Sequence, residues 1–371
     1  MSHILFISHA RGIHGAEAVM MRAAKACAAA GARVTLVVPS VVPDGGMENA
    51  LSGVNGLKIM ALPYRAAGVN ALRNALVRIY NLYALCRLAA FIKKEKIDVI
   101  YSSSSITILG AVLAKQTGVR HIWHWHEPVD KHFGWHPSMK NLYRRLAQRA
   151  DTIVFISHTQ QKEWEETLNL RLANARIVYN PIKPVEPVLS DKLMPHEEVK
   201  IGFIGHFEER KNIGLLIRSF ERIHAQHANC SLWLCGATGE ADRQYIQAMT
   251  SLRAPEVNIL PQTSEVAQFY HQIDILVLPS WRETMPLVVL EAMQAGVCVL
   301  QTNRSGMSEL LEGGKETLFF SPDRPEELEH LLMNCMDSDY RSRIAQAGQE
   351  KALYLVKNQQ FDQQIQTLLC E

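Results

Sequence analysis

Short apolar runs rich in β-branched residues alternate along the chain with longer segments of helical periodicity, and this alternation constrains the fold more than any other feature. Strands that alternate with helices predict βαβ units and parallel sheets, so we expect an α/β fold with Rossmann-like sheets. The first series of expected strands lies at 4–8, 34–38, 58–62, 98–102, 121–125, 152–156 and 176–179. The second series lies at 200–205, 231–235, 257–260, 274–278 and 297–301. Helical patterns fill most of the intervals, among them 16–30, 72–95, 137–149, 212–226 and 286–295.

A proline-rich segment separates the two series. Prolines as dense as those in 181–187 continue neither a helix nor a strand ladder, and 371 residues suit two domains better than one. We therefore expect a Rossmann-like domain at 1–180, a linker at 181–198 and a second Rossmann-like domain at 199–350, with ligands bound between their strand ends. The final helical stretch, 351–371, is longer than the second sheet needs, and its length suggests a return to the first domain.

The sequence also indicates a cellular compartment. No segment has the roughly eighteen consecutive apolar residues of a membrane span. The N-terminus runs straight into a strand-like stretch without a charged region before it, so we expect no signal peptide. The seven cysteines form no Cys-x-x-Cys pair, which is typical of reduced thiols rather than of a disulfide framework or a zinc site. Together these features predict a cytoplasmic protein.

Charge is distributed unevenly between the two halves. Residues 1–180 carry 22 of the 39 Lys and Arg residues but only 11 of the 37 Asp and Glu residues, so the first half is basic and the second acidic. This asymmetry indicates either different partners for the two halves or attraction between them across a cleft. A drift of surface charge without functional meaning is the alternative.

The strongest chemical pattern follows the fourth strand of the second series. A loop leads into a helix that begins at Pro286, a position that tolerates the missing N–H of proline. The first amide groups of this helix, at Leu287 and Val288, offer a site for a phosphate group. Glu283 and Glu291 flank this site, and carboxylates accept hydrogen bonds from sugar and ribose hydroxyls. A surface helix with two ordinary glutamates is the alternative interpretation.

A second loop, after the first strand of the second series, concentrates positive charge. It reads Gly205-His206-Phe207-Glu208-Glu209-Arg210-Lys211-Asn212 and leads into a helix. Cations at such a junction can neutralise a diphosphate, and a guanidinium can bind it through two hydrogen bonds. Arg210 and Lys211 are therefore candidate diphosphate ligands, with a solvated surface pair as the alternative.

These segments resemble the retaining glycosyltransferases of the GT-B fold, specifically family 4. Members carry a Gly-Arg-x-x-x-x-Lys-Gly/Asn motif and a Glu-x7-Glu motif in the C-terminal domain. The chain matches the first motif at 205–212, with Lys211 at the lysine position, and the second with Glu283 and Glu291. The resemblance spans nearly the whole chain and includes Gly15 in a small-residue loop and His126 in a Trp-His-Trp-His-Glu stretch. It implies two Rossmann-like domains that face each other across a cleft.

The resemblance implies a role for each matching position. In the C-terminal domain, Glu291 would bind the ribose hydroxyls, Glu283 the hydroxyls of the donor sugar, and Lys211 the diphosphate. The backbone near Leu287 and Val288 would cap that diphosphate. In the N-terminal, acceptor-side domain, Gly15 would let the backbone approach the phosphate or the sugar, and His126 would face the donor sugar. Core packing is the alternative role for His126.

One departure from the family concerns the diphosphate site. The family usually has Arg after the glycine of the first motif, whereas this chain has His206, which supplies fewer hydrogen-bond donors. Either Arg210 takes over, or His206 binds the diphosphate when protonated, or activity is weak.

The resemblance further implies retention of anomeric configuration, with the leaving diphosphate helping to deprotonate the acceptor hydroxyl. We expect no metal and no cofactor besides the nucleotide sugar. The Asp-x-Asp sequence at 337–339 precedes a helical pattern, so we interpret it as a helix N-cap rather than as a metal site.

The acceptor and a membrane surface are the remaining partners that the sequence suggests. The segment 49–94 holds no acidic residue, and within 72–94 a broad apolar stripe accompanies several cations. A basic amphipathic helix of this kind can lie on an anionic bilayer, which suits a peripheral enzyme with a glycan or lipid-linked acceptor, as in cell-surface polysaccharide or lipopolysaccharide synthesis. A helix packed on its sheet, with solvated arginines, is the alternative. We expect no nucleic-acid partner.

Two rival functions belong to other classes. An NAD-dependent dehydrogenase also has Rossmann-like halves, but the loop after the first strand lacks the Gly-x-Gly-x-x-Gly form that it requires. A partner subunit that binds nucleotide sugars without turnover is the second rival, and His206 is the residue that favours it.

Overall fold

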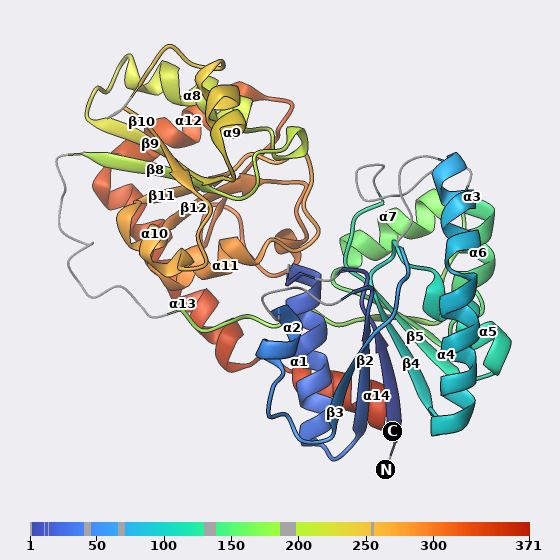
Figure 1. The fold of residues 1–371 in the computed structure, drawn as a ribbon. Coiled ribbons are helices and arrows are strands. Elements are labelled where there is room, and N and C mark those ends of the chain that lie inside the picture. Colours follow the sequence, from blue (N-terminus) through green and yellow to red (C-terminus); the bar gives the residue numbers. More distant parts are fainter. Residues whose placement is uncertain are drawn as a thin grey trace. The chain divides into compact units, whose positions relative to one another are not determined.

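The computed structural model describes residues 2–10, 12–13, 15–40, 46–65, 71–129, 139–185, 198–253 and 256–371. The chain forms two compact units (Figure 1). The first unit comprises Met1–Pro181 together with Gln360–Glu371, and the second comprises Ile182–Gln359. The boundary at Pro181 falls next to the expected end of the first domain at residue 180.

The first unit is built on a seven-stranded parallel sheet with the order β3-β2-β1-β4-β5-β6-β7. Its strands are β1 (His3–Ile7), β2 (Arg33–Val38), β3 (Leu57–Ala61), β4 (Val99–Ser103), β5 (Arg120–Trp125), β6 (Thr152–Phe155) and β7 (Ala175–Ile177). Its helices are α1 (Gly15–Ala29), α2 (Gly46–Ala50), α3 (Ala71–Tyr80), α4 (Leu82–Glu95), α5 (Leu109–Thr117), α6 (Lys140–Ala147), α7 (His158–Leu168) and α14 (Phe361–Cys370).

Helices cover both faces of this sheet. Ile4 and Phe6 of β1 pack into one apolar cluster with α1 and α14, whereas Leu5 and Ile7 pack into another with α4 and α5. Successive side chains of a strand point to opposite faces, so a strand buried on both sides must be apolar at every position. The continuous apolar run of β1 meets this requirement, because all five of its residues are buried.

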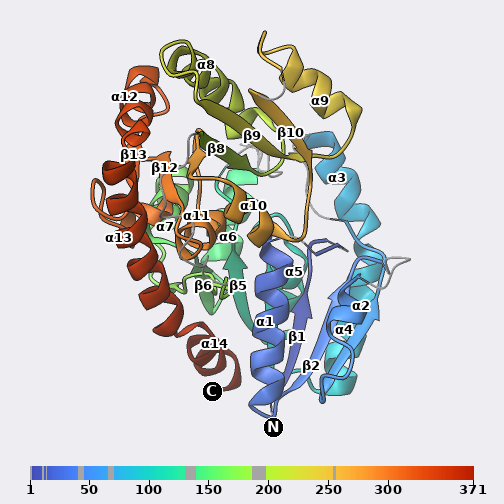
Figure 2. The same cartoon turned by 90° about the vertical axis from the view of Figure 1, so that its left-hand side faces the viewer.

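The second unit is built on a six-stranded parallel sheet with the order β10-β9-β8-β11-β12-β13. Its strands are β8 (Val199–Ile204), β9 (Cys230–Ala237), β10 (Val257–Pro261), β11 (Ile275–Leu278), β12 (Cys298–Thr302) and β13 (Leu318–Phe320). Its helices are α8 (Ile213–His224), α9 (Glu240–Gln247), α10 (Val266–Gln272), α11 (Leu287–Gln294), α12 (Pro325–Met336) and α13 (Ser338–Lys357), with short 3-10 turns η4 (Glu209–Lys211) and η5 (Gly306–Glu309). Figure 2 shows α12 and α13 as consecutive helices along one side of this sheet.

The expected strands and parallel sheets are confirmed, with two differences in detail. The edge strand β13 has three residues and was not predicted. The single helix expected at 72–95 is two helices, α3 and α4, which meet at Asn81. The buried Asn81 side chain accepts a hydrogen bond from the Arg65 amide and donates one to the Arg65 carbonyl, both at 2.9 Å, and so ties this junction to the preceding segment.

The C-terminal segment divides between the two units. Asp337 caps α13 by accepting a 2.7 Å hydrogen bond from the Tyr340 amide, which confirms the N-cap interpretation of 337–339. Residues 351–357 continue α13 in the second unit, and the first unit resumes at Gln360, later than the expected boundary at 351.

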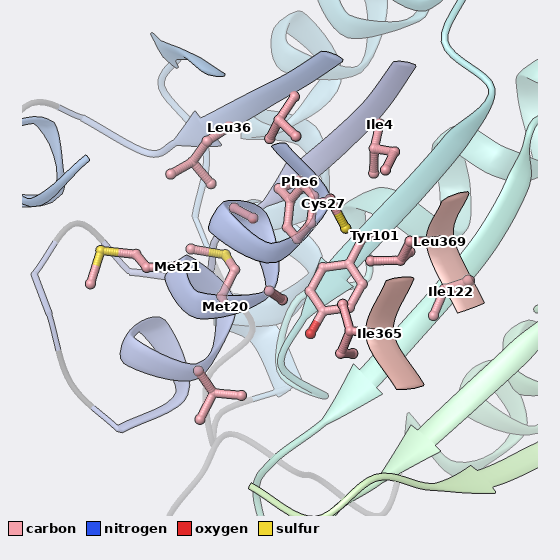
Figure 3. Packing of buried hydrophobic residues seen from close by; sticks show 14 of the residues in the cluster. Ile4, Phe6, Met20, Met21, Cys27, Leu36, Tyr101, Ile122, Ile365 and Leu369 are labelled. Atoms are coloured by element: carbon pink, nitrogen blue, oxygen red, sulfur yellow. The ribbon is translucent and has the colours of Figure 1, made fainter. Parts of the chain in front are cut away.

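The last helix, α14, packs against α1 in the core of the first unit. Figure 3 shows Ile365 and Leu369 beside Tyr101 and Cys27. Arg22 of α1 donates two hydrogen bonds to the Asp362 carboxylate, at 2.9 and 3.1 Å. Burial of the apolar face of α14, together with this ion pair, therefore makes the chain terminus part of the first unit.

The described part of the proline-rich segment is held in place by glutamine side chains. The Ile182 amide donates to Gln359, and the Val185 amide donates to Gln294. Gln294 donates in return to the Lys183 carbonyl at 3.0 Å. Residues 182–185 therefore belong structurally to the second unit, while 186–197 of the expected linker lie outside the described residues.

Candidate functional site

Close backbone packing shapes the loop that follows β8. Gly205 has a φ of +147°, a region that favours glycine, and its amide donates a 3.0 Å hydrogen bond to the Cys235 carbonyl of β9. A Cβ atom on Gly236 would lie 1.9 Å from the Gly205 carbonyl oxygen, so glycine is required where these two strand ends meet. Further along, Asn212 adopts a left-handed φ of +51° between η4 and α8, which explains why glycine or asparagine suits this position.

The loop after β8 meets the loop after β11 at a buried carboxylate. Lys211 Nζ donates a 2.6 Å hydrogen bond to Glu283 Oε1, and Arg210 Nη1 lies 3.6 Å from the same oxygen. Ser280 Oγ donates to this oxygen at 2.6 Å. Arg210 also pairs with the half-exposed Glu208 at 3.1 Å. The structure thus brings together Arg210, Lys211 and Glu283, although 72 residues separate Lys211 from Glu283 in the sequence.

Backbone hydrogen bonds hold these loops together. The Trp281 amide donates to the Arg210 carbonyl at 3.0 Å. On the other side, the Glu283 amide donates to the Arg304 carbonyl at 2.9 Å, and the Gly306 amide donates to the Glu283 carbonyl at 3.2 Å. Three loops, which follow β8, β11 and β12, therefore fix the position of Glu283.

The cations around Glu283 keep it ionised. Burial alone would raise the pKa of this carboxyl group, but Lys211, Arg210 and the Ser280 hydroxyl together lower the pKa below its ordinary value. Lys211 and Arg210 pair with Glu283 and Glu208 here, and both cations can donate charge-assisted hydrogen bonds to a bound anion.

The helix after the Glu283 loop begins where the sequence predicts. Pro286 occupies the N-cap of α11 and the helix proper starts at Leu287. The helix supplies no acceptor for its first amide groups, among them those of Leu287 and Val288, and its N-terminus favours negative charge. Glu291 accepts a 3.0 Å hydrogen bond from the Tyr270 hydroxyl, and burial raises the pKa of Glu291 despite this bond and the nearby Lys183.

His206 lies apart from this charge cluster. Its side chain is exposed. The pKa of Asp242 on α9 is lowered mainly by hydrogen bonds from Thr238 and, to a smaller degree, by His206. His206 is therefore near α9. Of the two alternatives to the family's arginine, Arg210 is the one that contacts Glu283.

In the first unit, the carboxyl ends of β1 and β5 bring ionisable side chains together. His126 and Glu127, directly after β5, are both buried, as is Glu17 in the first turn of α1. His9, two residues after β1, places Nδ1 2.8 Å from Glu17 Oε1. Ligands of parallel α/β sheets bind at this edge of the sheet.

Gly15 is the first residue of α1. A Cβ atom at this position would have no described protein atom within 4 Å apart from its chain neighbours. Contacts within the described chain therefore do not require glycine here, and the surrounding space is open.

Three residues that complete these clusters were not predicted from the sequence. His9 lies outside the recognised motif, and Ser280 and Tyr270 are ordinary residues whose partners, Glu283 and Glu291, are identified only by the fold. For His9, the available signal was its position just after a buried strand, where polar side chains gather at the sheet edge.

Comparisons with known proteins agree with this architecture. The family model described as Glycosyltransferase Family 4 matches residues 13–186, and that described as Glycosyl transferases group 1 matches residues 198–338. A relative described as an uncharacterized glycosyltransferase of Haemophilus influenzae is 24% identical over 270 residues, which cover 67% of this chain and 73% of the relative.

Solved structures share the fold over the whole chain. The structure of HepE from Anabaena in complex with UDP-glucose has a TM-score of 0.80 at 19% identity and covers 100% of both chains. The structure of WaaG, a glycosyltransferase involved in lipopolysaccharide biosynthesis, has a TM-score of 0.69 at 16% identity and covers 98% of this chain and 99% of its own. With both halves matched by the family models and this fold shared, the chain belongs to the group 1 glycosyltransferases of the GT-B fold.

Proposed function

We propose that the protein is a retaining, metal-independent glycosyltransferase. It moves a hexose-type sugar from a nucleoside-diphosphate sugar, with UDP or GDP as the nucleotide, to a glycan or lipid-linked acceptor. The observation that carries this proposal is the contact of Lys211 and Arg210 with Glu283, whose loop also leads to the start of α11. Cations and free helix amides bind phosphate, while carboxylates bind hydroxyl groups.

Each part of the donor is assigned to particular residues of the second unit. Lys211 and Arg210 bind the diphosphate together with the Leu287 and Val288 amides. Glu283 then accepts hydrogen bonds from the donor sugar, and Glu291 binds the ribose hydroxyls. The rigid support of Glu283 by three loops favours this assignment, because positioning groups act best when their geometry is fixed. His206, being exposed and outside the cluster, adds at most a weak contact to the diphosphate.

In the first unit, His126 contacts the donor sugar and Gly15 leaves room for it. A buried, neutral imidazole offers one donor and one acceptor, which suits a sugar hydroxyl. The open space at Gly15 is consistent with a ligand that approaches the backbone.

The reaction then needs charge stabilisation more than an added base. As the glycosidic bond to the diphosphate breaks, negative charge develops on the leaving oxygen next to Lys211, Arg210 and the α11 amides. The leaving diphosphate accepts the proton of the acceptor hydroxyl on the same face of the sugar, so the anomeric configuration is retained. The chain's own share is to hold both substrates in place and to stabilise that charge.

The solved structures suggest the substrate class. HepE was crystallised with UDP-glucose, and WaaG acts in lipopolysaccharide biosynthesis. We infer by analogy a nucleoside-diphosphate hexose as donor, and cell-surface polysaccharide or lipopolysaccharide synthesis as the pathway.

A panel of nucleotides and nucleotide sugars tests this function. UDP, GDP, ADP and CMP, each alone and with its sugars, are compared by thermal shift and by slow donor hydrolysis. We expect one diphosphate to stabilise the protein and its sugar conjugate to be hydrolysed. Stabilisation without any hydrolysis or transfer would support the rival role, a partner subunit that binds nucleotide sugars without turnover. No stabilisation by any nucleotide would contradict both.

A membrane surface is the second partner that we propose. The exposed large apolar side chains of the first unit concentrate on α3 and the start of α4; they are Leu72, Leu76, Ile79, Tyr80, Leu82 and Tyr83. Further along α4, Leu88 and Ile92 are buried against the sheet. Only this later part of α4 therefore fits the alternative interpretation, a helix packed on its sheet.

Positive charge accompanies this apolar surface. Arg65, Arg87, Lys93 and Lys94 are exposed, and the segment 49–94 contains no acidic residue. Within the described residues, no helix combines the length and the apolar character needed to cross a bilayer. A peripheral attachment to the anionic inner face of the membrane, with the protein in the cytoplasm, fits this pattern, and all seven cysteines are free thiols.

Vesicle sedimentation tests the attachment. At low salt the protein should bind phosphatidylglycerol-containing vesicles but not pure phosphatidylcholine vesicles. The double substitution Leu76→Ser and Ile79→Ser should weaken binding roughly tenfold or more, because two apolar side chains no longer enter the bilayer. The matched control, Leu353→Ser with Tyr354→Ser on α13, should bind like the unaltered protein. Equal binding of all three proteins would contradict the assignment of this surface.

A further inference from the structure

Four ionisable side chains, three of them buried, form a cluster at the carboxyl edge of the first sheet. They come from three elements: His9 follows β1, Glu17 lies on α1, and His126 and Glu127 follow β5. Glu17 is 1% exposed, and His126 and Glu127 are each 7% exposed. His9 joins the cluster through Glu17, with 2.8 Å between its Nδ1 and the carboxylate oxygen. We call these four residues the His9 cluster.

The Glu127 carboxylate cannot move away from the cluster. Its Oε2 accepts hydrogen bonds from the Ser105 amide at 2.8 Å and from the Ser105 hydroxyl at 2.7 Å. Its own carbonyl oxygen accepts bonds from Gln160 and Trp164 on α7. Burial would raise the pKa of Glu127, but His9, His126 and the serine hydrogen bonds lower the pKa below its ordinary value. Glu127 is therefore a fixed negative charge.

The two histidines of the cluster differ in charge. Burial would lower the pKa of His9, but the close contact with Glu17 and the charge of Glu127 raise it above the ordinary value. For His126, burial dominates and lowers the pKa to about 4, with the positive charge of His9 acting in the same direction. At neutral pH His126 is thus an uncharged imidazole, while His9 is the more easily protonated ring. Pairs of groups whose environments separate their pKa values in this way often divide acid and base roles.

The described residues also leave the hydrogen-bonding capacity of the His126 ring unused. Asn180 faces it, yet neither ring nitrogen makes a hydrogen bond of ordinary geometry to the described residues. A buried polar group left without partners is costly, and such groups mark places where a ligand binds. Only the neutral ring can both donate to and accept from a hydroxyl-bearing ligand, since a protonated imidazole donates from both nitrogens and accepts no hydrogen bond.

We propose that His9 is a positioning residue whose imidazolium balances the buried carboxylates of Glu17 and Glu127, so that His126 remains neutral and able both to donate and to accept a hydrogen bond. This inference rests on the proposed function only for the identity of the ligand, a sugar hydroxyl. Without the His9 charge, the two carboxylates would favour the protonated form of His126 and so raise its pKa.

The other titratable groups around the cluster are neutral at physiological pH. Tyr64, which follows β3, has a pKa raised far above the ordinary value by burial and by Glu17. His124 of β5 has a pKa lowered far below the ordinary value by burial and by His126. Tyr101 of β4 is buried beside His124, and burial raises its pKa in the same way as that of Tyr64. Within the described residues, His9 is therefore the group that can supply positive charge.

Histidine NMR on full-length protein without substrate tests the charge assignment directly. The substitution His9→Gln keeps a polar side chain but removes the charge, and the pKa of His126 should then rise by about one unit or more. His271→Gln, an exposed histidine on α10, is the matched control and should leave His126 unchanged. An unchanged pKa of His126 in folded His9→Gln protein would overturn the proposal, whatever reaction the enzyme catalyses.

The pH profile of donor hydrolysis provides a functional readout. His126 accepts a hydrogen bond only while it is neutral, and its pKa is about 4, so hydrolysis should fall on the acidic side in the unaltered protein. His9→Gln removes the cation and should move this fall to higher pH. His9→Lys keeps a cation and should leave the fall in place. A residue of merely structural importance would lower the melting temperature of both variants without moving the profile, and that result would also overturn the proposal.

Discussion

The polar clusters of the two units differ in their balance of charge. In the second unit, two cations, Arg210 and Lys211, gather around the single buried carboxylate of Glu283. In the first unit, two buried carboxylates gather around one imidazole, His9, next to the neutral His126. A nucleotide sugar has the same division, with an anionic diphosphate and an uncharged sugar. Each cluster therefore has the charge that suits one part of the proposed donor.

The difference also shows how each cluster is built. The charges of the second unit sit on loops joined by backbone hydrogen bonds, and they neutralise one another when no ligand is bound. The charges of the first unit sit at strand ends and on the first turn of α1, where burial decides which group is ionised. Substitutions of the two cations in the second unit should thus change ligand affinity, and substitutions in the first cluster should change protonation.

The largest expected effect belongs to Glu283. Glu283→Gln should reduce sugar transfer by roughly 100- to 1,000-fold, the loss typical of removing one preorganised catalytic contact. Binding of the nucleoside diphosphate should stay equal or become tighter, because Lys211 and Arg210 are released from the carboxylate. Transfer rates and calorimetric titration with UDP or GDP measure the two effects. Glu312→Gln, an exposed glutamate, is the control and should change neither. Equal losses of binding and transfer would contradict the proposal that Glu283 contacts the sugar and not the diphosphate.

Lys211 should give the next largest effect. Lys211→Ala should weaken nucleoside-diphosphate binding about 10- to 100-fold, as expected for the loss of one hydrogen bond between charged groups. The same titration measures it, with the exposed Lys315→Ala as control. Affinity within twofold of the unaltered protein would mean that the diphosphate does not bind at this cluster.

A smaller effect distinguishes Arg210 from His206. Arg210→Ala should weaken diphosphate binding roughly 3- to 10-fold, because its ion pair with Glu208 already offsets part of the Arg210 charge. His206→Ala should stay within about twofold, since its side chain is exposed and lies towards α9. The reverse order would show that His206 replaces the family's arginine after all.

Glu291 should give an effect on binding of the same size as that of Arg210. Burial raises the pKa of this carboxyl group in the folded protein, so its ionised form costs stability above its unfolded pKa. Glu291→Gln should therefore leave the melting temperature at pH 8 equal or slightly higher, while nucleotide binding weakens by roughly 3- to 10-fold through loss of the ribose contact. Thermal melts with and without nucleotide measure both changes. A lower melting temperature without nucleotide, together with unchanged binding, would indicate a structural role for the Tyr270–Glu291 hydrogen bond.

The sequence predicts the sheets well because each buried strand is a continuous apolar run between helical patterns. The strand β13 escaped prediction because three residues are too few to show a period. The division of 72–95 at Asn81 depends on a hydrogen-bonded contact with Arg65, which periodicity does not reveal.

The candidate site was only partly predictable for a related reason. Motif spacing identified Glu283, Glu291 and Lys211, but the meeting of Lys211 with Glu283 across 72 residues follows from the order of strands in the sheet. His9 was missed because a lone histidine after a strand has no spacing pattern. Its role depends on a partner, Glu17, whose burial only the folded structure shows.

A crystal structure with bound UDP or GDP tests the central claim most directly. We expect the diphosphate within hydrogen-bonding distance of Lys211 Nζ and at the amino end of α11, with the ribose hydroxyls on Glu291. A nucleotide bound elsewhere, with Lys211 still paired to Glu283 as in the ligand-free protein, would contradict the account.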